Sequence, residues 1–220
     1  RLLCLAAGGG RQSSLYAAAG ADVTVVDLSG AMLELDRRVA SERGYNMRLF
    51  ETSMEDLSML REAEFDIVIH PVSTCYVPNV QRVFAEVARV TRPGGIYVSQ
   101  HKQPTSLQAG LERGKSGRYE IEHSYYRDAP IPTTKSESRN AQRLREPGAI
   151  EFLHRWEQLI GGICRSGFVI EDLSEPSHAK PDSPLNSFAD RAKHVAPYVR
   201  IKSRRRSSNA SAQTLWLPNG

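Results

Sequence analysis

The sequence predicts an α/β fold in which a doubly wound, mostly parallel sheet is covered by helices on both faces. Short apolar runs alternate with helical patterns over the first hundred residues, the order that parallel strands and crossover helices require. The runs at 2–7 and 23–26 are almost continuously apolar, as in strands that are buried on both faces. Three consecutive glycines, residues 8–10, follow the first run directly.

Capping residues delimit the helices between these strands. Ser29 is expected to cap a helix that ends before Gly44, with Leu28 and Leu33 at the two positions of a hydrophobic staple. Asn79 precedes the most clearly amphipathic stretch, which Arg92-Pro93-Gly94-Gly95 ends. We expect strands at 2–7, 23–26, 47–50, 65–69 and 96–99, and helices at 13–20, 29–43, 57–62 and 80–90.

The alternation is interrupted at residues 103–149, which are rich in Pro, Gly, Ser and Arg. This stretch has too few aliphatic residues for a core of its own, so we interpret it as an insertion with one strand at 119–126. A helix at 150–166 and strands at 168–173 and 195–203 then complete the sheet. The sequence therefore predicts a single domain at 1–203 and a disordered basic tail at 204–220.

The charge and the cysteines limit the partners and the compartment. The net charge is +4, but residues 191–220 hold seven basic side chains and no acid, so the rest of the chain carries −3. Because no aromatic platform accompanies these basic residues, we do not expect nucleic acid binding. Cys4, Cys75 and Cys164 are far apart and form no C-x-x-C motif, which predicts no disulfide framework and no metal site.

No apolar run is long enough to span a bilayer, and no signal peptide is visible. Together with the unpaired cysteines, this favours the cytoplasm. The chain opens directly on a strand, which indicates that a preceding segment is missing.

The glycine turn and the end of the second strand predict a nucleotide site. Glycines allow the backbone to approach a ligand closely, and an acid that ends the second strand, here Asp27, binds ribose hydroxyls in such folds. Gly8-x-Gly10-x-x-Ser13 nearly fits the dinucleotide fingerprint, with serine at the third glycine position. The glycine motif alone is about equally typical of a site for NAD and of a site for S-adenosylmethionine.

Four segments decide between these cofactors. Residues 5–10 (LAAGGG), 25–33 (VVDLSGAML), 65–69 (FDIVI) and 76–95, which ends in Arg92-Pro93-Gly94-Gly95, occur in this order and spacing. Through them the chain resembles the class I S-adenosylmethionine-dependent methyltransferases of the small-molecule type. The resemblance implies a seven-stranded sheet with its last strand antiparallel, and S-adenosylmethionine as cofactor.

The resemblance also implies where the cofactor binds. Its methionine part would face the backbone of Ala6, Gly8 and Gly10, and its ribose would bind Asp27. Its adenine would lie between Ser53 and Met54, and Leu28 would also contact the cofactor. His70 would lie beside the sulfonium through its main chain. The sequence departs from the family at Cys4 and Ser53, where an acid is usual, and at Ala6, where glycine is usual.

Methyl transfer needs a general base only when the acceptor is protonated. The histidines near strand ends are His70, His101, His123 and His154, and we expect His101 and His154 to serve as the catalytic pair. Tyr125, Tyr126 and Trp156 are candidates for lining an acceptor pocket. We expect methyl transfer to a small, aromatic or quinone-like acceptor; the alternatives are an NAD-dependent oxidoreductase and a cofactor-binding protein without catalysis.

Overall fold

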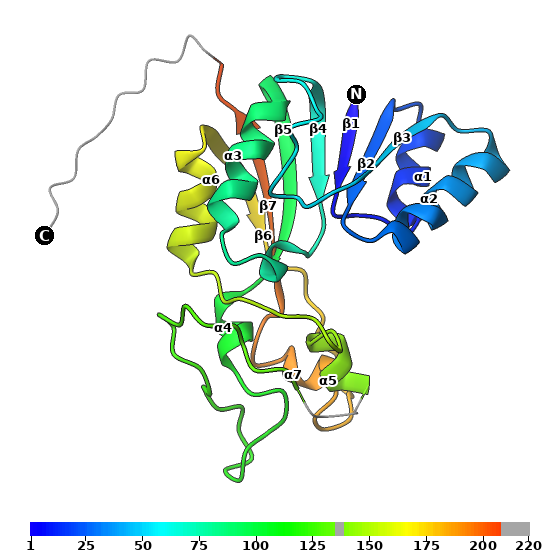
Figure 1. Ribbon diagram of the computed structural model, residues 1–220. Coiled ribbons are helices and arrows are strands. Elements are labelled where there is room, and N and C mark those ends of the chain that lie inside the picture. The colour runs from blue at the N-terminus through cyan, green and yellow to red at the C-terminus, as the bar shows by residue number, and fades with distance from the viewer. Residues whose placement is uncertain (135–138, 208–220) are drawn as a thin grey trace, which may run out of the picture.

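A computed structural model describes residues 1–134 and 139–207 (Figure 1). One sheet of seven strands runs through the molecule in the order β3-β2-β1-β4-β5-β7-β6. The first five strands are parallel to their neighbours, and β7 is antiparallel to both β5 and β6. The strands are β1 Leu2–Leu5, β2 Val23–Asp27, β3 Met47–Glu51, β4 Phe65–His70, β5 Thr91–Lys102, β6 Phe168–Ser174 and β7 Tyr198–Arg205. The predicted fold class, including the antiparallel last strand, is confirmed.

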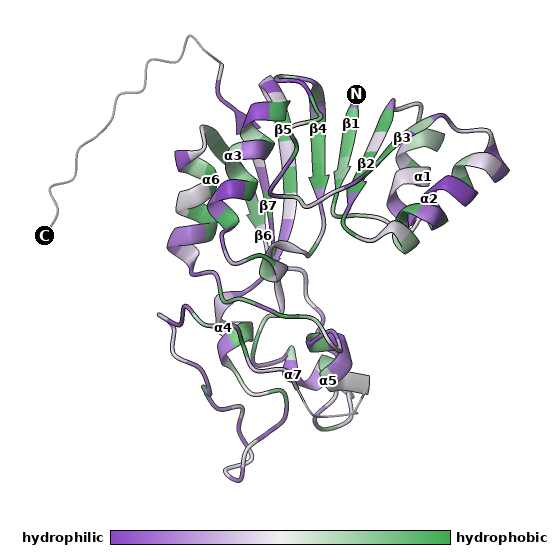
Figure 2. Cartoon of the chain, in the orientation of Figure 1, coloured by the Kyte–Doolittle hydropathy of each residue, from purple (hydrophilic) through white to green (hydrophobic). Residues whose placement is uncertain are grey.

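Helices cover both faces of this sheet (Figure 1). One face is covered by α1 (Arg11–Ala18) and α2 (Gly30–Arg43), and the other by α3 (Val80–Val90), the π-helix η2 (Glu157–Gly161) and α6 (Gly162–Arg165). Side chains of β1 alternate between the two cores, Leu3 and Leu5 packing with α3, and Leu2 and Cys4 with α1 and α2. The inner strands are accordingly the most apolar part of the chain in Figure 2.

The capping residues act as predicted. The Ser29 hydroxyl accepts a hydrogen bond from the Met32 N–H at the start of α2, and Gly44 ends that helix in a left-handed conformation. The Asn79 side chain caps α3 in the same way, by accepting from the Gln81 N–H. The expected staple at α2 is not formed as a buried pair, because Leu33 is buried whereas Leu28 is 72% exposed.

Residues 103–149 leave the sheet at the end of β5 and lie beyond the carboxyl ends of the parallel strands (Figure 1). They contribute two short helices, α4 (Pro104–Gln108) and α5 (Arg139–Leu144), and α7 (Phe188–Arg191) packs against α5. The buried Arg191 guanidinium joins these parts by donating to the carbonyl oxygens of Ser106, Ala109 and Gly110. We call residues 103–149 the insertion.

β5, at Thr91–Lys102, is much longer than the strand predicted at 96–99, and three further predicted elements differ in type or in where they begin. The strand at 119–126 is absent, since Ile121 makes only an isolated bridge to Ala109. Turns replace the helix at 57–62. The helix at 150–166 begins only at Trp156, because residues 150–155 are extended and pair elsewhere.

The end of the sheet extends further than expected. β7 continues through Arg204 and Arg205, two residues that we assigned to the tail, and Arg204 pairs with Glu171 of β6. The rest of the predicted disordered tail, from residue 208, lies outside the described residues. Among the helices that the structure describes, none is long and apolar enough to cross a membrane.

Candidate active site

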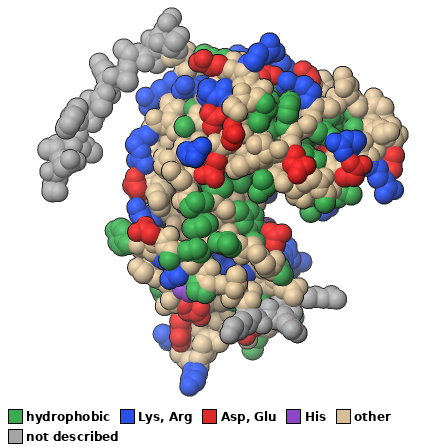
Figure 3. All heavy atoms as spheres, viewed as in Figure 1, with side chains coloured by type: hydrophobic (Ala, Val, Ile, Leu, Met, Phe, Trp, Pro, Cys, Tyr) green, Lys and Arg blue, Asp and Glu red, His purple; other side chains and the backbone are tan. Residues whose placement is uncertain are grey.

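A cavity of about 580 Å³ opens at the carboxyl ends of β1, β2, β3 and β4. The molecular surface is hollowed on this side, between the helices α1 and α2 and the insertion (Figure 3). Loops that follow four neighbouring strands and one residue of the insertion form its wall. The lining residues are Ala6, Gly8, Val26, Asp27, Leu28, Ser29, Met32, Thr52, Ser53, Met54, Val72, Ser73, Tyr76, Val77 and Glu146.

The glycine turn forms the floor of this cavity. Ala6 follows β1 with φ of 48°, a left-handed conformation that an L-residue rarely adopts. A Cβ at Gly8 would lie 2.8 Å from Cβ of Met32, so a side chain does not fit there. Gly10 caps α1 with φ of 72° and faces α2, away from the cavity. Ala6 and Gly8 thus border the cavity, whereas Gly10 shapes the turn.

Asp27 ends β2 beside this turn. Its Oδ2 accepts a hydrogen bond from the Gly8 N–H at 2.8 Å, and its Oδ1 accepts one from the Ser29 N–H at 2.9 Å. These bonds fix the carboxylate at the cavity wall. A carboxylate has about four acceptor positions, so further hydroxyl groups can bind to it.

A second carboxylate, which was not predicted from the sequence, binds the glycine turn on the side of α2. Asp36 of α2 is fully buried, accepts a hydrogen bond from the Gly9 N–H at 2.8 Å and another from the Ser13 hydroxyl. It lies close to Cys4, and burial together with Asp36 raises the pKa of that thiol to about 12. A sequence signal existed, because Asp36 occupies the same helix face as the buried Leu33 and Ala40.

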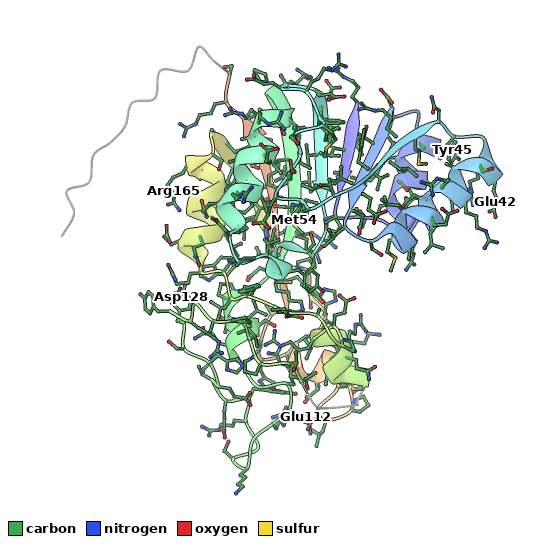
Figure 4. All side chains as sticks on the ribbon, in the orientation of Figure 1. Glu42, Tyr45, Met54, Glu112, Asp128 and Arg165 are labelled. Atoms are coloured by element: carbon green, nitrogen blue, oxygen red, sulfur yellow. The ribbon has the colours of Figure 1, made fainter. Side chains whose placement is uncertain are left out.

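Three further predicted residues line the cavity. Leu28 follows β2, and Ser53 and Met54 follow β3, so they lie on the β3 side of the glycine turn. The Ser53 hydroxyl accepts from the Glu55 N–H, which holds this loop in a turn. Met54 is labelled in Figure 4.

The predicted histidines His70, His101 and His154 are in the core, His123 is half-buried in the insertion, and none of the four lines the cavity. His70 is 1% exposed, with its Nδ1 2.8 Å from the Tyr97 hydroxyl and its Nε2 2.8 Å from the Ser73 hydroxyl. It borders a separate cavity of about 340 Å³ on the α1 side. Burial lowers the pKa of His70 to about 3, which keeps the ring neutral.

His101 and His154 are held in the same way. The ring nitrogens of His101 lie 2.8 Å from the hydroxyls of Thr74 and Ser99, and burial lowers the pKa of His101 to about 3. His154 Nε2 lies 3.0 Å from the Thr74 carbonyl and 2.9 Å from that of Val77, and burial lowers its pKa. Their role as catalytic bases stays a prediction, and this burial does not favour it.

The candidate aromatic residues also lie away from the cavity lining. Trp156 packs against the main core, and the Tyr125 hydroxyl accepts from its N–H at 3.2 Å. Tyr126 is 75% exposed.

The β4 end of the cavity is formed by residues that were not predicted as site residues. Tyr76, from the 3₁₀ helix η1 (Thr74–Tyr76), donates its hydroxyl to Oε2 of Glu146 at 2.7 Å. Glu146 is the one residue of the insertion among the described residues that line the cavity. Seventy positions separate the two partners, so nothing local in the sequence predicts this contact.

A doubly wound sheet whose strand ends enclose a cavity behind a glycine turn and a strand-ending acid defines a nucleotide-cofactor-binding protein. The model of a family described as methyltransferase domain matches residues 3–99. The uncharacterized methyltransferase YbaJ of Bacillus subtilis (strain 168) is 35% identical over 175 residues, 80% of this chain and 68% of that protein. The chain belongs to the S-adenosylmethionine-dependent methyltransferases.

Two further comparisons agree. The ubiquinone biosynthesis O-methyltransferase of Aromatoleum aromaticum is 37% identical over 95 residues, which are 43% of this chain and 41% of that protein. The crystal structure of an S-adenosylmethionine-dependent methyltransferase from Mesorhizobium loti superposes with a TM-score of 0.72 at 22% identity. That superposition covers 93% of this chain and 90% of the other, and it shows the shared fold.

The cavity residues fit S-adenosylmethionine. Ala6 and Gly8 of the turn line the cavity, and Asp27 retains acceptor positions for hydroxyl groups. Among the described residues that line the cavity, two are acidic and none is basic, which suits a cofactor that carries a sulfonium cation.

Proposed function

We propose that this enzyme methylates a small-molecule acceptor, aromatic or quinone-like, that binds at the β4 end of the cavity. The observation that carries the proposal is the shape of the cavity. It extends from the loop after β3, past Asp27 and the glycine turn, to Tyr76 and Glu146 beyond β4. One cavity therefore has room for a cofactor end and an acceptor end.

The cofactor end would use the residues expected from the sequence. Ala6 and Gly8 would present backbone to the methionine part, and Asp27 would bind the ribose, whereas Gly10, which does not line the cavity, would act only by shaping the turn. The adenine would lie near Leu28, Ser53 and Met54, which line the cavity on the β3 side. His70 does not line this cavity, so its place beside the sulfonium stays a prediction.

The cofactor, when bound, supplies a methyl group that is activated by the sulfonium sulfur to which it is bonded. The protein then has to orient the acceptor and exclude water. Val72, Val77 and Tyr76 form an apolar wall at the acceptor end, which suits a flat apolar molecule. Support for an oxygen acceptor comes from the ubiquinone biosynthesis O-methyltransferase, which is similar to this chain over 95 residues.

Calorimetric titration with S-adenosylhomocysteine tests the cofactor end. Asp27→Ala removes the carboxylate that we assign to the ribose, and we expect binding to become undetectable while the circular dichroism spectrum is unchanged. Asp22→Asn is the matched control, because Asp22 is exposed at the opposite end of β2. Unchanged affinity in Asp27→Ala would contradict the assignment.

Turnover on a panel of phenol, catechol and hydroquinone tests the acceptor end. We expect methylated product with at least one of them, detected by mass spectrometry. A protein that binds S-adenosylhomocysteine but methylates none of the panel would contradict the aromatic acceptor and leave the cofactor assignment standing.

We also propose that residues 1–203 act as one domain and that the enzyme works in the cytoplasm. Arg191 and the contact between Tyr76 and Glu146 join the insertion to the rest of the chain. The three cysteines are free, as is usual in a reducing compartment.

A further inference from the structure

Methylation of a hydroxyl or amine requires a group that takes the proton from the acceptor. Such a group has to reach the acceptor, so it has to line the cavity. Among the described residues that line the cavity, three have an acidic or phenolic side chain that can exchange a proton: Asp27, Tyr76 and Glu146. The four histidines near strand ends, His70, His101, His123 and His154, are not among the lining residues.

The hydrogen bonds of these three groups distinguish them. Each oxygen of Asp27 already accepts a backbone N–H, and Asp27 lies on the β2 side, at the cofactor end. Tyr76 donates its hydroxyl proton to Oε2 of Glu146, so its oxygen is not free to act as a base. Burial also raises the pKa of Tyr76 far above its usual range.

We propose that Glu146 binds the O–H or N–H group of the acceptor and accepts its proton during methyl transfer. The proposal rests on the proposed function and names the class of acceptor for the same site. The acceptor oxygen bonds to the methyl carbon, the carbon–sulfur bond breaks with its electron pair left on sulfur, and the oxygen's proton passes to the Glu146 carboxylate. Solvent receives that proton after product release.

Glu146 is held by one contact to its carboxylate and one to its backbone. Tyr76 fixes Oε2 through the 2.7 Å hydrogen bond, which leaves Oε1 for the acceptor. The backbone N–H of Glu146 points to Oε1 of Glu151 at 3.4 Å, and Glu151 is itself bound by Lys102 and Arg145. Groups that are fixed in this way lose little freedom when a ligand binds.

The same network supports Tyr76. Nζ of Lys102 lies 5.9 Å from the centre of the Tyr76 ring and donates to Oε1 of Glu151 at 2.6 Å. Both partners of the Tyr76–Glu146 contact are therefore anchored on one buried ion cluster, which we call the Glu151 cluster (Lys102, Arg145 and Glu151).

The lining also indicates what the acceptor lacks. Among the described lining residues there is no Lys, Arg or His, so a carboxylate or phosphate on the acceptor would find no partner inside the cavity. A neutral phenol or hydroquinone can donate to Glu146 and place its ring against Tyr76 and the valines. We therefore assign an acceptor with a hydrogen-bond donor and no buried anionic group.

Binding of two related probes, of which only one carries a hydrogen-bond donor, tests this assignment together with Glu146→Ala. Hydroquinone and 1,4-dimethoxybenzene are titrated into the protein saturated with S-adenosylhomocysteine. We expect hydroquinone to bind at least tenfold more tightly, and Glu146→Ala to remove that difference. Equal affinity of the two probes in the unmodified protein, or an undiminished difference in Glu146→Ala, would overturn the proposal.

Kinetics separate proton acceptance from binding. For any phenol that is turned over, Glu146→Gln should lower kcat about 100-fold or more with a smaller change in KM. Its rate should then rise about tenfold per pH unit as the phenol ionises unaided, while the unmodified enzyme shows a flatter profile. A variant that keeps the original kcat and pH profile would overturn the role as a base.

Two controls complete the design. Asp128→Asn makes the same chemical change at an exposed carboxylate of the insertion, which lies away from Met54 in Figure 4, and should leave both probes and kcat unchanged. Glu146→Gln should bind S-adenosylhomocysteine as tightly as the unmodified protein. Weakening of tenfold or more would mean that Glu146 binds the cofactor, and would overturn the proposal while the methyltransferase activity stands.

Discussion

The backbone of Ala6 adopts a conformation that favours glycine. With φ of 48°, its Cβ is crowded against the following carbonyl, which costs about 1–2 kcal/mol for an L-residue. Glycine relieves this strain but adds about 0.4–1 kcal/mol of freedom to the unfolded chain, so we predict that Ala6→Gly stabilises the protein by up to about 1 kcal/mol and raises Tm by up to about 2–4 °C. Thermal unfolding followed by circular dichroism measures this shift.

Ala7 provides the matched control at the neighbouring position. It does not appear among the residues with positive φ, and it is buried. Ala7→Gly should therefore lower the stability, because glycine only adds freedom to the unfolded chain. If both substitutions change Tm in the same direction, strain at Ala6 is not the cause.

Single residues also show what could be learned from the sequence about the site. Asp27 follows a strand and a glycine turn, a local pattern, and it does border the cavity. Glu146 reaches the cavity only because a chain of seventy residues folds back onto Tyr76. Local patterns identify the cofactor end, whereas long-range contacts create the acceptor end.

The elements β4, η1 and β5 are joined by buried neutral histidines, and this makes stability depend on pH. Burial lowers the pKa of His70 and His101 to about 3 in the folded protein, while in the unfolded chain it is about 6.5. Below pH 6.5 the unfolded chain takes up protons that the folded protein excludes, so acid favours unfolding.

We predict that the free energy of unfolding is greatest above pH 6.5 and falls as the pH decreases. The slope contributed by each of these histidines is about 1.4 kcal/mol per pH unit. Urea unfolding between pH 7 and pH 5 measures it. His101→Gln should remove the contribution of one of the two histidines, about half of the slope that they give together. A slope that does not change in this variant would contradict the lowered pKa of His101.

The insertion is attached to β5 through the Glu151 cluster. All three side chains are less than 10% exposed, and Glu151 bonds to Lys102 at 2.6 Å and to Arg145 at 2.9 Å. Glu151→Gln would leave two buried cations without a carboxylate. We predict a loss of about 3–5 kcal/mol in the free energy of unfolding, measured by urea denaturation.

The exposed ion pair between Glu157 and Arg165 is the matched control. Glu157→Gln makes the same substitution where both side chains are more than half exposed, and should cost less than about 1 kcal/mol. If Glu151→Gln and Glu157→Gln lower the free energy of unfolding by similar amounts, burial does not increase the contribution of the Glu151 cluster to stability.

The elements that the sequence predicted well are those with local signals. Caps define α2 and α3, α3 also has a continuous apolar face, and both helices end where expected. The strand at 119–126 had alternation but no neighbouring strand to pair with, so the pattern alone was insufficient. Residues 150–155 carry helical spacing, yet Glu151 is drawn to Ile131 and to the buried cations.

At the scale of the whole molecule, ligand binding to the folded state should raise the melting temperature. At one hundred times its Kd, S-adenosylhomocysteine adds about 2.7 kcal/mol to the free energy of unfolding. For a chain of this size we predict a rise in Tm of about 5–10 °C. NAD at the same concentration should leave Tm unchanged, and a comparable rise with NAD would contradict the cofactor assignment.

The position of β7 has a consequence for how the chain is made. β7 lies between β5 and β6, and the Ser203 hydroxyl bonds to the Tyr97 carbonyl across 106 residues. During synthesis, β5 therefore exposes an unpaired edge, and β6 has no β7 to join, until residues 198–205 have emerged. Unpaired edges promote aggregation, so the nascent chain is most vulnerable just before its last strand is complete.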